Sequence, residues 1–187
     1  MSGARHRTCP GIRVELVKKA ARHVATDPDR AYVPDMGRPH RVQIAGGTYH
    51  VTSRGNRHQS IYHDDDDRKL FLALRDQVVQ KCGWRTLAHC LMTNHFHLLI
   101  ETPAPNLSVG MHRLNSDYAR YFNERHSFEG HLFERRFSSR LVETEEHLAK
   151  ALRYIAFNPV EAGLCVHPRD WQWSSFYGVE ESFVFDL

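Results

Sequence analysis

Three stretches of the chain have the hydrophobic and polar pattern of β-strands. Residues 47–54 alternate between two faces along their length, and Gly55 and Asn56 follow them as a break. Residues 84–92 and 95–101 are two further β-like runs that are separated by only two residues, so a β-hairpin is predicted there.

Three other stretches have apolar residues spaced three and four apart, which is typical of amphipathic helices. Four aspartates, residues 64–67, come at the start of the first, where carboxylates cap free N–H groups and suit the helix dipole. Tyr118 lies in the apolar stripe of the second and is predicted to be a core residue. Thr144 is predicted to cap the third, and Pro159 to end it or to follow it closely. The predicted helices are residues 68–83, 107–125 and 145–157.

The order of these elements, with a further strand expected within residues 130–143, predicts an α+β fold. We expect a ferredoxin-like or RRM-like antiparallel sheet with its helices packed on one face. Residues 1–40 are rich in Arg, Pro, Asp and Gly and show no strand pattern, so we expect a partly flexible N-terminal extension. The domain itself is expected to span residues 41–187, with the aromatic segment 170–176 packed as a lid on the core.

The composition is that of an ordinary globular domain. The 187 residues are 41% hydrophobic and 25% charged, which argues against a disordered chain. No apolar run approaches the roughly 18–20 residues of a membrane helix, and the N-terminus lacks the apolar centre of a signal peptide. We therefore expect a cytoplasmic protein with no membrane partner. The four cysteines show no C-x-x-C or zinc-finger spacing and are expected to be reduced thiols.

Arginines gather in a few segments, although a formal net charge of +3 is in itself weak evidence for a nucleic-acid partner. Such segregation can give a domain a basic face for phosphates. A solvated surface without a partner is the alternative for each cluster. The candidate phosphate-contacting residues are Arg54, Arg57, Arg135, Arg136 and Arg140.

Two histidines, His95 and His97, interrupt an otherwise apolar run. Residues i and i+2 of a strand point to the same face with Cβ atoms about 6–7 Å apart, so two such imidazoles can bind one metal ion. Phe96, Leu98 and Ile100 point the other way, into the core, so the histidines are expected on the face that the helices leave uncovered. A pair of exposed strand histidines without a ligand is the alternative.

The third predicted helix carries a tyrosine and an asparagine outside its buried stripe. At about 100° per residue, Leu148, Leu152 and Ile155 share one face of the helix. Tyr154 lies about 120° from that stripe, and Asn158 follows one turn later, about 40° from Tyr154. The helix therefore offers an aromatic hydroxyl that packing does not require, with an amide oxygen beside it.

The segments "TNHFHLLIE", "RYIAFNPVEAGL" and "WQWSSF", in this order, resemble the REP-associated tyrosine transposases. These are relatives of the single-tyrosine insertion-sequence transposases within the HUH endonuclease superfamily, which is named for a His-hydrophobic-His motif. The segments "GRPHR" and "YHVTSRGNR" are also similar to that family. The resemblance runs from about residue 37 to residue 178.

The resemblance implies a role for each candidate residue. His95 and His97 match the metal-binding pair of the family. Tyr154 matches its nucleophilic tyrosine, and Asn158 matches the polar third ligand four residues later. The implied activity is cleavage and rejoining of single-stranded DNA at imperfect palindromic hairpins, with Mg²⁺ or Mn²⁺ and a 5′-phosphotyrosine intermediate. Arg38 and His40 are expected to reach bases near the hairpin foot, and a monomer is favoured over a homodimer.

Three other functions stay open at this point. A hairpin-binding protein without catalytic activity would have the same fold, although the chain keeps all four residues of the implied centre. An RRM-like RNA-binding module would display aromatic side chains on its central strands, where this chain has His95 and His97. A zinc hydrolase would need an Asp or Glu at a telling spacing, and none stands out.

Overall fold

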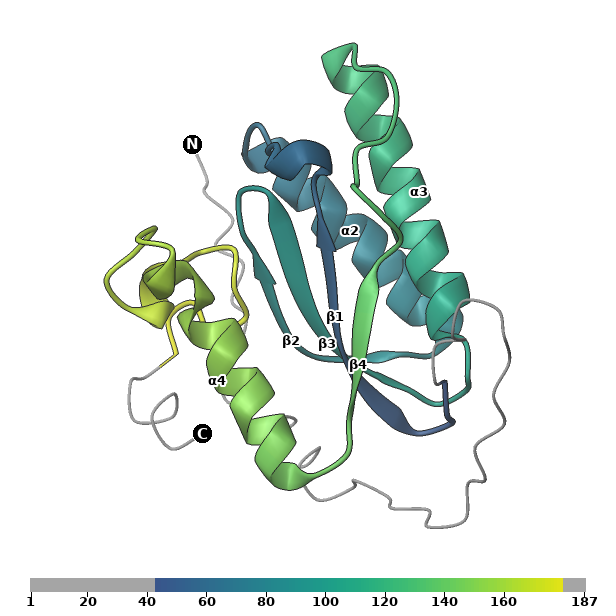
Figure 1. Cartoon of the computed structure of the whole chain (residues 1–187), viewed down its shortest axis with the longest axis vertical. Helices are drawn as coiled ribbons and strands as arrows, with labels where there is room; N and C mark the ends of the chain where they lie inside the picture. The colour runs from purple at the N-terminus through teal and green to yellow at the C-terminus, as the bar shows by residue number, and fades with distance from the viewer. Residues whose placement is uncertain (1–42, 180–187) are drawn as a thin grey trace, which may run out of the picture.

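The computed structural model of the protein describes residues 43–179, and Figure 1 shows their arrangement. The predicted extension, residues 1–40, lies outside this range, and so does Arg38. The fold of the described residues is α+β with one antiparallel sheet, which confirms the predicted class. None of the helices within residues 43–179 combines the length and the apolarity needed to cross a bilayer.

Four antiparallel strands form the sheet in the order β2-β3-β1-β4. In the central pair, Val51 of β1 lies opposite Leu98 of β3, and Thr52 lies opposite His97. β4 pairs with the other side of β1 and is the strand that was expected within residues 130–143. The strands are β1 (Gly47–Arg54), β2 (Arg85–Leu91), β3 (His95–Thr102) and β4 (Ser138–Val142).

Two helices, α2 (Asp65–Cys82) and α3 (Leu107–His126), cover one face of the sheet. Phe96 points from β3 into this core, where its ring centroid lies 4.6 Å from that of Phe71 of α2. Phe71 in turn packs edge-on against Tyr118 of α3 at 5.1 Å. All three rings are fully buried, so each contributes roughly 1.5–3 kcal/mol or more through apolar burial.

The third helix, α4 (Glu145–Glu161), lies on the other face of the sheet (Figure 1). Its stripe of Leu148, Leu152 and Ile155 is buried, as predicted, and packs in one cluster with Leu99 of β3. The expectation of helices on one face therefore holds for α2 and α3 but not for α4. The reason is that β2 and β3 carry apolar side chains on both faces, so that the second face also needs cover.

The aspartate run begins α2, as predicted. The Asp64 side chain accepts hydrogen bonds from the backbone N–H groups of Asp66 and Asp67, each at 3.0 Å. Because this cap precedes residue 65, the helix begins three residues earlier than the periodicity indicated. At the other end, Gly83 has a left-handed φ of 68°, a conformation that suits glycine at a helix C-terminus.

The ends of α4 follow the prediction on one side only. Thr144 accepts a hydrogen bond from the backbone N–H of His147 at 3.1 Å, which confirms the predicted cap. The helix does not end before Pro159 but continues through it to Glu161. Proline has a φ that fits a helix, but it lacks the N–H of the helical bond and its ring crowds the carbonyl four residues earlier. Only two residues of α4 follow it, so the helix ends within the same turn.

The aromatic segment 170–176 packs along the edge strand β2. This agrees with the prediction that the segment covers the core. The Leu91 backbone N–H donates to the carbonyl oxygen of Trp173 at 2.9 Å, and the Trp171 indole N–H donates to the Leu91 carbonyl at 2.9 Å. Phe176 is buried in the cluster under α4. The segment therefore covers an edge that would otherwise leave backbone groups unpaired.

Candidate active site

Three histidines and a tyrosine lie together where the sheet faces α4. The ring centroids of His95 and His97 are 4.9 Å apart, at an interplanar angle of 82°. The Tyr154 ring stands edge-on to His97 at 5.3 Å and to His50, a histidine of β1, at 5.8 Å. The structure thus brings the two motif histidines and the helix tyrosine into one cluster.

The local structure explains this placement. His95 and His97 alternate along β3 with core residues, and the pairing of Thr52 with His97 sets His50 on the same face. Tyr154 lies on α4 outside the buried stripe, as the helix geometry predicted, and its side chain is 46% exposed. An aromatic residue with an accessible hydroxyl is therefore held beside the histidines by a helix whose other face is packed.

Asn158 completes the group from the next turn of α4. It is 9% exposed, and its amide lies within interaction range of both motif histidines, where it opposes the lowering of their pKa values. The spacing of four residues from Tyr154 puts the two side chains on neighbouring rows of the helix, which is what the sequence predicted.

Burial lowers the pKa of all three histidines. The pKa of His97 lies well below its usual value of 6.5, mainly through desolvation. Desolvation, with positive groups nearby, lowers the pKa of His50 to about 4. The pKa of His95 is also lowered, by burial and then by the charge of Arg54. All three imidazoles are therefore neutral at pH 7 and have a nitrogen lone pair to offer.

The contacts of His97 indicate how a metal ion could fit. Its Nδ1 lies 3.0 Å from Nε2 of His50, whereas its own Nε2 is buried and has no hydrogen-bond partner within residues 43–179. A buried nitrogen lone pair without a donor is a group that a bound cation would satisfy. Among the described residues, no group of three His, Cys, Asp or Glu side chains could hold a metal ion. The Asn158 amide is a further donor near both motif histidines.

The structure divides the arginine candidates between two regions. Arg54 ends β1 directly opposite His95, and Arg140 of β4 pairs with His50, so both lie on the face of the histidines. Arg57 is exposed in the 3-10 turn that follows β1, with a left-handed φ of 53°.

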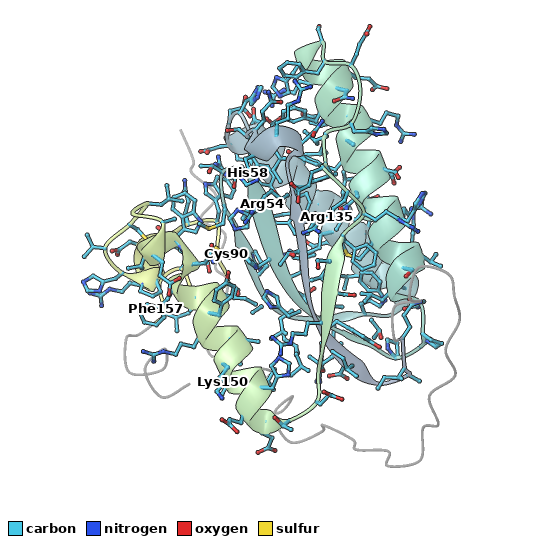
Figure 2. All side chains as sticks on the ribbon, viewed as in Figure 1. Arg54, His58, Cys90, Arg135, Lys150 and Phe157 are labelled. Atoms are coloured by element: carbon cyan, nitrogen blue, oxygen red, sulfur yellow. The ribbon has the colours of Figure 1, made fainter. Side chains whose placement is uncertain are left out.

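The other two arginines, Arg135 and Arg136, line a groove between α3 and residues 130–137. Arg135 is 69% exposed at its side chain and forms an ion pair with Glu134 at 3.4 Å. Figure 2 shows Arg54 towards the end of β1 and Arg135 near the start of β4. The sequence had grouped these arginines with Arg140, but the structure does not bring them to the histidine cluster.

His50 is the site residue that sequence reasoning missed. No pattern in the sequence assigned it a role. The alternation along the strand indicated its face, yet only the register between β1 and β3 places it beside His97. Strand register depends on long-range pairing, which a single sequence does not specify.

The two tyrosines of α3 lie away from this cluster. Tyr118 is fully buried on the opposite face of the sheet, and its hydroxyl donates to the Ile61 carbonyl, which confirms it as a core residue. Tyr121 is on the same helix and is half-buried. Of the described tyrosines, Tyr154 is the one whose ring contacts the histidines of β1 and β3.

Comparison with known proteins defines the class. The family model described as "Transposase IS200 like" matches residues 43–158, more than half of the chain, and the chain belongs to this family of transposases. The match includes the strand histidines, Tyr154 and Asn158.

Two individual relatives indicate which group of transposases the chain resembles in sequence and fold. A protein of Haemophilus influenzae with the provisional name REP-associated tyrosine transposase is 28% identical over 118 residues, which are 57% of this chain and 67% of the relative. The solved structure of a REP-associated tyrosine transposase bound to a REP hairpin aligns with a TM-score of 0.64 and 19% identity. The alignment covers 76% of this chain and 84% of the solved chain, and it shows that the two proteins share a fold. These similarities confirm the resemblance to REP-associated tyrosine transposases.

Proposed function

We propose that the protein is a metal-dependent single-strand DNA endonuclease and strand transferase that acts on imperfect palindromic hairpins. The observation that carries this proposal is the half-exposed Tyr154 ring, 5.3 Å from the ring of His97, in a chain of the IS200-like transposase family. Hairpin DNA as the partner is supported by the solved relative, which is bound to a REP hairpin.

Tyr154 is the proposed nucleophile. Its oxygen forms a bond to the scissile phosphorus as the bond from phosphorus to the 3′ oxygen breaks. The phenol gives up its proton, and the departing 3′ oxygen takes one up. The products are a free 3′-hydroxyl and a 5′-phosphotyrosyl link that retains the bond energy, so attack by another 3′-hydroxyl rejoins a strand without ATP.

His95, His97 and Asn158 are the proposed ligands of a divalent ion, Mg²⁺ or Mn²⁺. When bound, such an ion supplies polarisation of the scissile phosphate and offsets the negative charge of the transition state. The neutral imidazoles and the unpartnered Nε2 of His97 support this assignment. Two nitrogens and an amide oxygen accept several divalent ions, so the ligand set does not choose between the two metals.

The arginines on the histidine face are the proposed contacts to the scissile strand. Arg54 and Arg140 flank the cluster from β1 and β4, and Arg57 follows β1 in an exposed turn. Arg135 and Arg136 are proposed to contact DNA farther from the cut, along the groove beside α3. Arg38 is proposed to contact bases at the hairpin foot, and a monomer is the proposed acting unit.

An RNA-binding role of the RRM type is less well supported. Such modules stack bases on aromatic side chains of their central strands. Here the aromatic residues of the central strands, Tyr49 of β1 and Phe96 of β3, point into the core and are almost fully buried. The face under α4 presents histidines instead, which favours metal and phosphate chemistry over base stacking.

A labelled hairpin oligonucleotide with a single-stranded flank, titrated with Mg²⁺ or Mn²⁺ after chelation, tests the proposal. We expect cleavage that depends on the ion and is lost in His95→Ala and His97→Ala. The matched control is His167→Ala, which removes a half-buried histidine just before the 3-10 turn Pro168–Asp170, outside both the histidine cluster and the groove, and should cleave normally. Hairpin binding without cleavage at any ion concentration would identify an inactive binder, and equal cleavage in chelator would remove the metal from the proposal.

A further inference from the structure

Each motif histidine has its Nδ1 atom against a side chain of the protein. We propose that Asn94 and His50 are positioning residues that keep the proton of each ring on Nδ1 and present both Nε2 atoms to the same point. This inference rests on the proposed function, because it assigns the two Nε2 lone pairs to the divalent ion. It gives a role to two residues to which the family resemblance assigned none.

The hydrogen bonds of Asn94 determine the direction of its amide. Asn94 lies in the turn between β2 and β3, and its Nδ2 donates to the carbonyl oxygen of His58 at 3.1 Å. A carbonyl only accepts, so the NH₂ group faces His58 and the Oδ1 atom faces His95, 2.8 Å from Nδ1 of that ring. An amide oxygen also only accepts. Nδ1 of His95 must therefore carry the proton, which leaves a lone pair on Nε2 of the neutral ring.

The contact between His50 and His97 indicates that Nδ1 also carries the proton in the His97 ring. One of the two nitrogens that are 3.0 Å apart must donate to the other. If His97 carried its proton on Nε2, that N–H would be a buried donor with no acceptor within hydrogen-bond distance, although the Asn158 amide lies nearby. With the proton on Nδ1, His97 donates to Nε2 of His50, which accepts when His50 carries its own proton on Nδ1. The remaining Nε2 lone pair then suits a cation.

Asn94 also ties the histidine centre to the turn that follows β1. Its backbone carbonyl accepts from the Gly55 N–H at 2.8 Å, in addition to the side-chain bond to His58. Arg57 and His58 hold left-handed φ values of 53° and 61°, which are unfavourable for residues other than glycine and need such anchors. One amide therefore fixes both the His95 ring and the turn that carries Arg57.

Ring tautomers in the chelated full-length protein test the inference directly. In ¹⁵N NMR spectra of the imidazoles, we expect the Nδ1–H form for both His95 and His97. Asn94→Ala should give His95 a mixture of forms and leave His97 unchanged, whereas Asn94→Asp, which keeps an acceptor, should restore the Nδ1–H form. An Nε2–H form at His95 in the wild type would overturn the assignment.

The second readout is the affinity for Mn²⁺, measured by calorimetry on the same proteins. Loss of an outer-shell partner usually weakens metal binding about 10–100-fold, and we expect this for Asn94→Ala. Asn94→Asp should bind within about threefold of the wild type. The matched control is Asn123→Ala, which also removes an asparagine donor to a loop carbonyl, that of Gly130, but on α3. Unchanged affinity in Asn94→Ala would contradict the inference.

His50 offers an independent check on the second ring. His50→Phe keeps an aromatic ring but removes the acceptor, so His97 should lose its single tautomer, and His50→Gln should restore it. Retention of the Nδ1–H form by His97 in His50→Phe would contradict a role for His50. If the wild type binds no Mn²⁺ at all, the proposed metal centre fails, while the tautomers still decide whether Asn94 and His50 set the rings.

Discussion

The two faces of strand β3 differ in what they do. Phe96, Leu98 and Ile100 point to α2 and α3, are fully buried and form an apolar core. His95 and His97, one position out of step, point to the side of α4 and carry the nitrogens of the site. One strand therefore buries an apolar row towards α2 and α3 and places two histidines on the face of the proposed site, because side chains alternate with a period of two.

The two helix layers show the same contrast in their tyrosines. Tyr118 of α3 is fully buried, and its hydroxyl donates a hydrogen bond to the Ile61 carbonyl. Burial raises the pKa of this hydroxyl far above the usual range. Tyr154 of α4 is 46% exposed and touches histidine rings. A hydroxyl that is satisfied inside a core stabilises the fold, whereas one left accessible beside neutral imidazoles is available for reaction.

The largest expected effect comes from substituting each of the two tyrosines by Phe, which should affect cleavage in one case and stability in the other. Tyr154→Phe should reduce hairpin cleavage by about 10³-fold or more, since it removes the proposed nucleophile, while the free energy of unfolding stays within about 0.5 kcal/mol. Tyr118→Phe should cleave normally but lose about 1–2 kcal/mol, because the buried Ile61 carbonyl loses its donor. Cleavage assays and urea denaturation of both variants measure the two effects. Lost cleavage in Tyr118→Phe with normal cleavage in Tyr154→Phe would contradict the assignment of the nucleophile.

Stability should distinguish the faces of β3 in the same way. Phe96→Ala should cost about 3–5 kcal/mol of unfolding free energy, because it empties a fully packed site between Phe71 and the sheet. His95→Ala, one residue away, removes a half-buried ring and should cost less than about 1 kcal/mol. Denaturant titrations at pH 7 compare the two. Equal costs would mean that the histidine face is also part of the structural core.

Acid should weaken the helix layer through one buried carboxylate. Burial raises the pKa of Asp67, but hydrogen bonds from the His63 amide, His126 and Arg125 outweigh it, so the pKa lies below the usual 3.8. A carboxylate with a lowered folded-state pKa stabilises the protein above its unfolded value and loses this effect as the pH falls through the folded value. We therefore expect the free energy of unfolding to fall below about pH 4.

Asp67→Asn tests this assignment. It should cost about 2–4 kcal/mol at pH 7, since it removes one partner of a buried ion pair, and it should flatten part of the acid slope. Asp66→Asn is the matched control: its ion pair with Lys69 is about two-thirds exposed and should contribute less than about 0.5 kcal/mol. Similar losses in the two variants would show that burial does not set the difference.

The smallest effect concerns the charges on the two faces. Arg140→Gln on the histidine face should lower the slope of log K against log salt for hairpin binding by about 0.7–0.9, the value for one phosphate contact. Arg120→Gln on α3, where the arginine pairs with Asp117, should leave the slope unchanged. Fluorescence anisotropy at several salt concentrations measures both. An equal change would mean that Arg120, which does not line the groove of Arg135 and Arg136, also contacts DNA.

Local patterns in the sequence predicted much of this arrangement. Periods of two and of three to four residues located the hairpin of β2 and β3 and the three helices, and helix geometry alone set Tyr154 apart from the stripe of Leu148. Each of these predictions depends on neighbours within one or two turns of chain. They hold because short-range geometry determines which side chains share a face.

Apart from the exact ends of α2 and α4, the features that the sequence did not predict depend on long-range contacts. The face chosen by α4 follows from the apolar residue Leu99 on the histidine side of β3, and the role of His50 follows from the register of β1 against β3. The separation of Arg135 from Arg140 follows from how residues 130–137 pack beside α3 before β4 begins. Neither sheet register nor layer order can be derived from the periodicity of a single chain.

The central claim is that the exposed tyrosine of α4, and not a buried tyrosine of the core layer, forms the covalent link to DNA. A suicide hairpin substrate that cannot be rejoined, followed by nuclease and protease digestion and mass spectrometry, tests it most directly. We predict a 5′-phosphotyrosyl peptide that contains Tyr154 in the wild type and no adduct in Tyr154→Phe. An adduct on Tyr118 or Tyr121, or cleavage by Tyr154→Phe, would contradict the account.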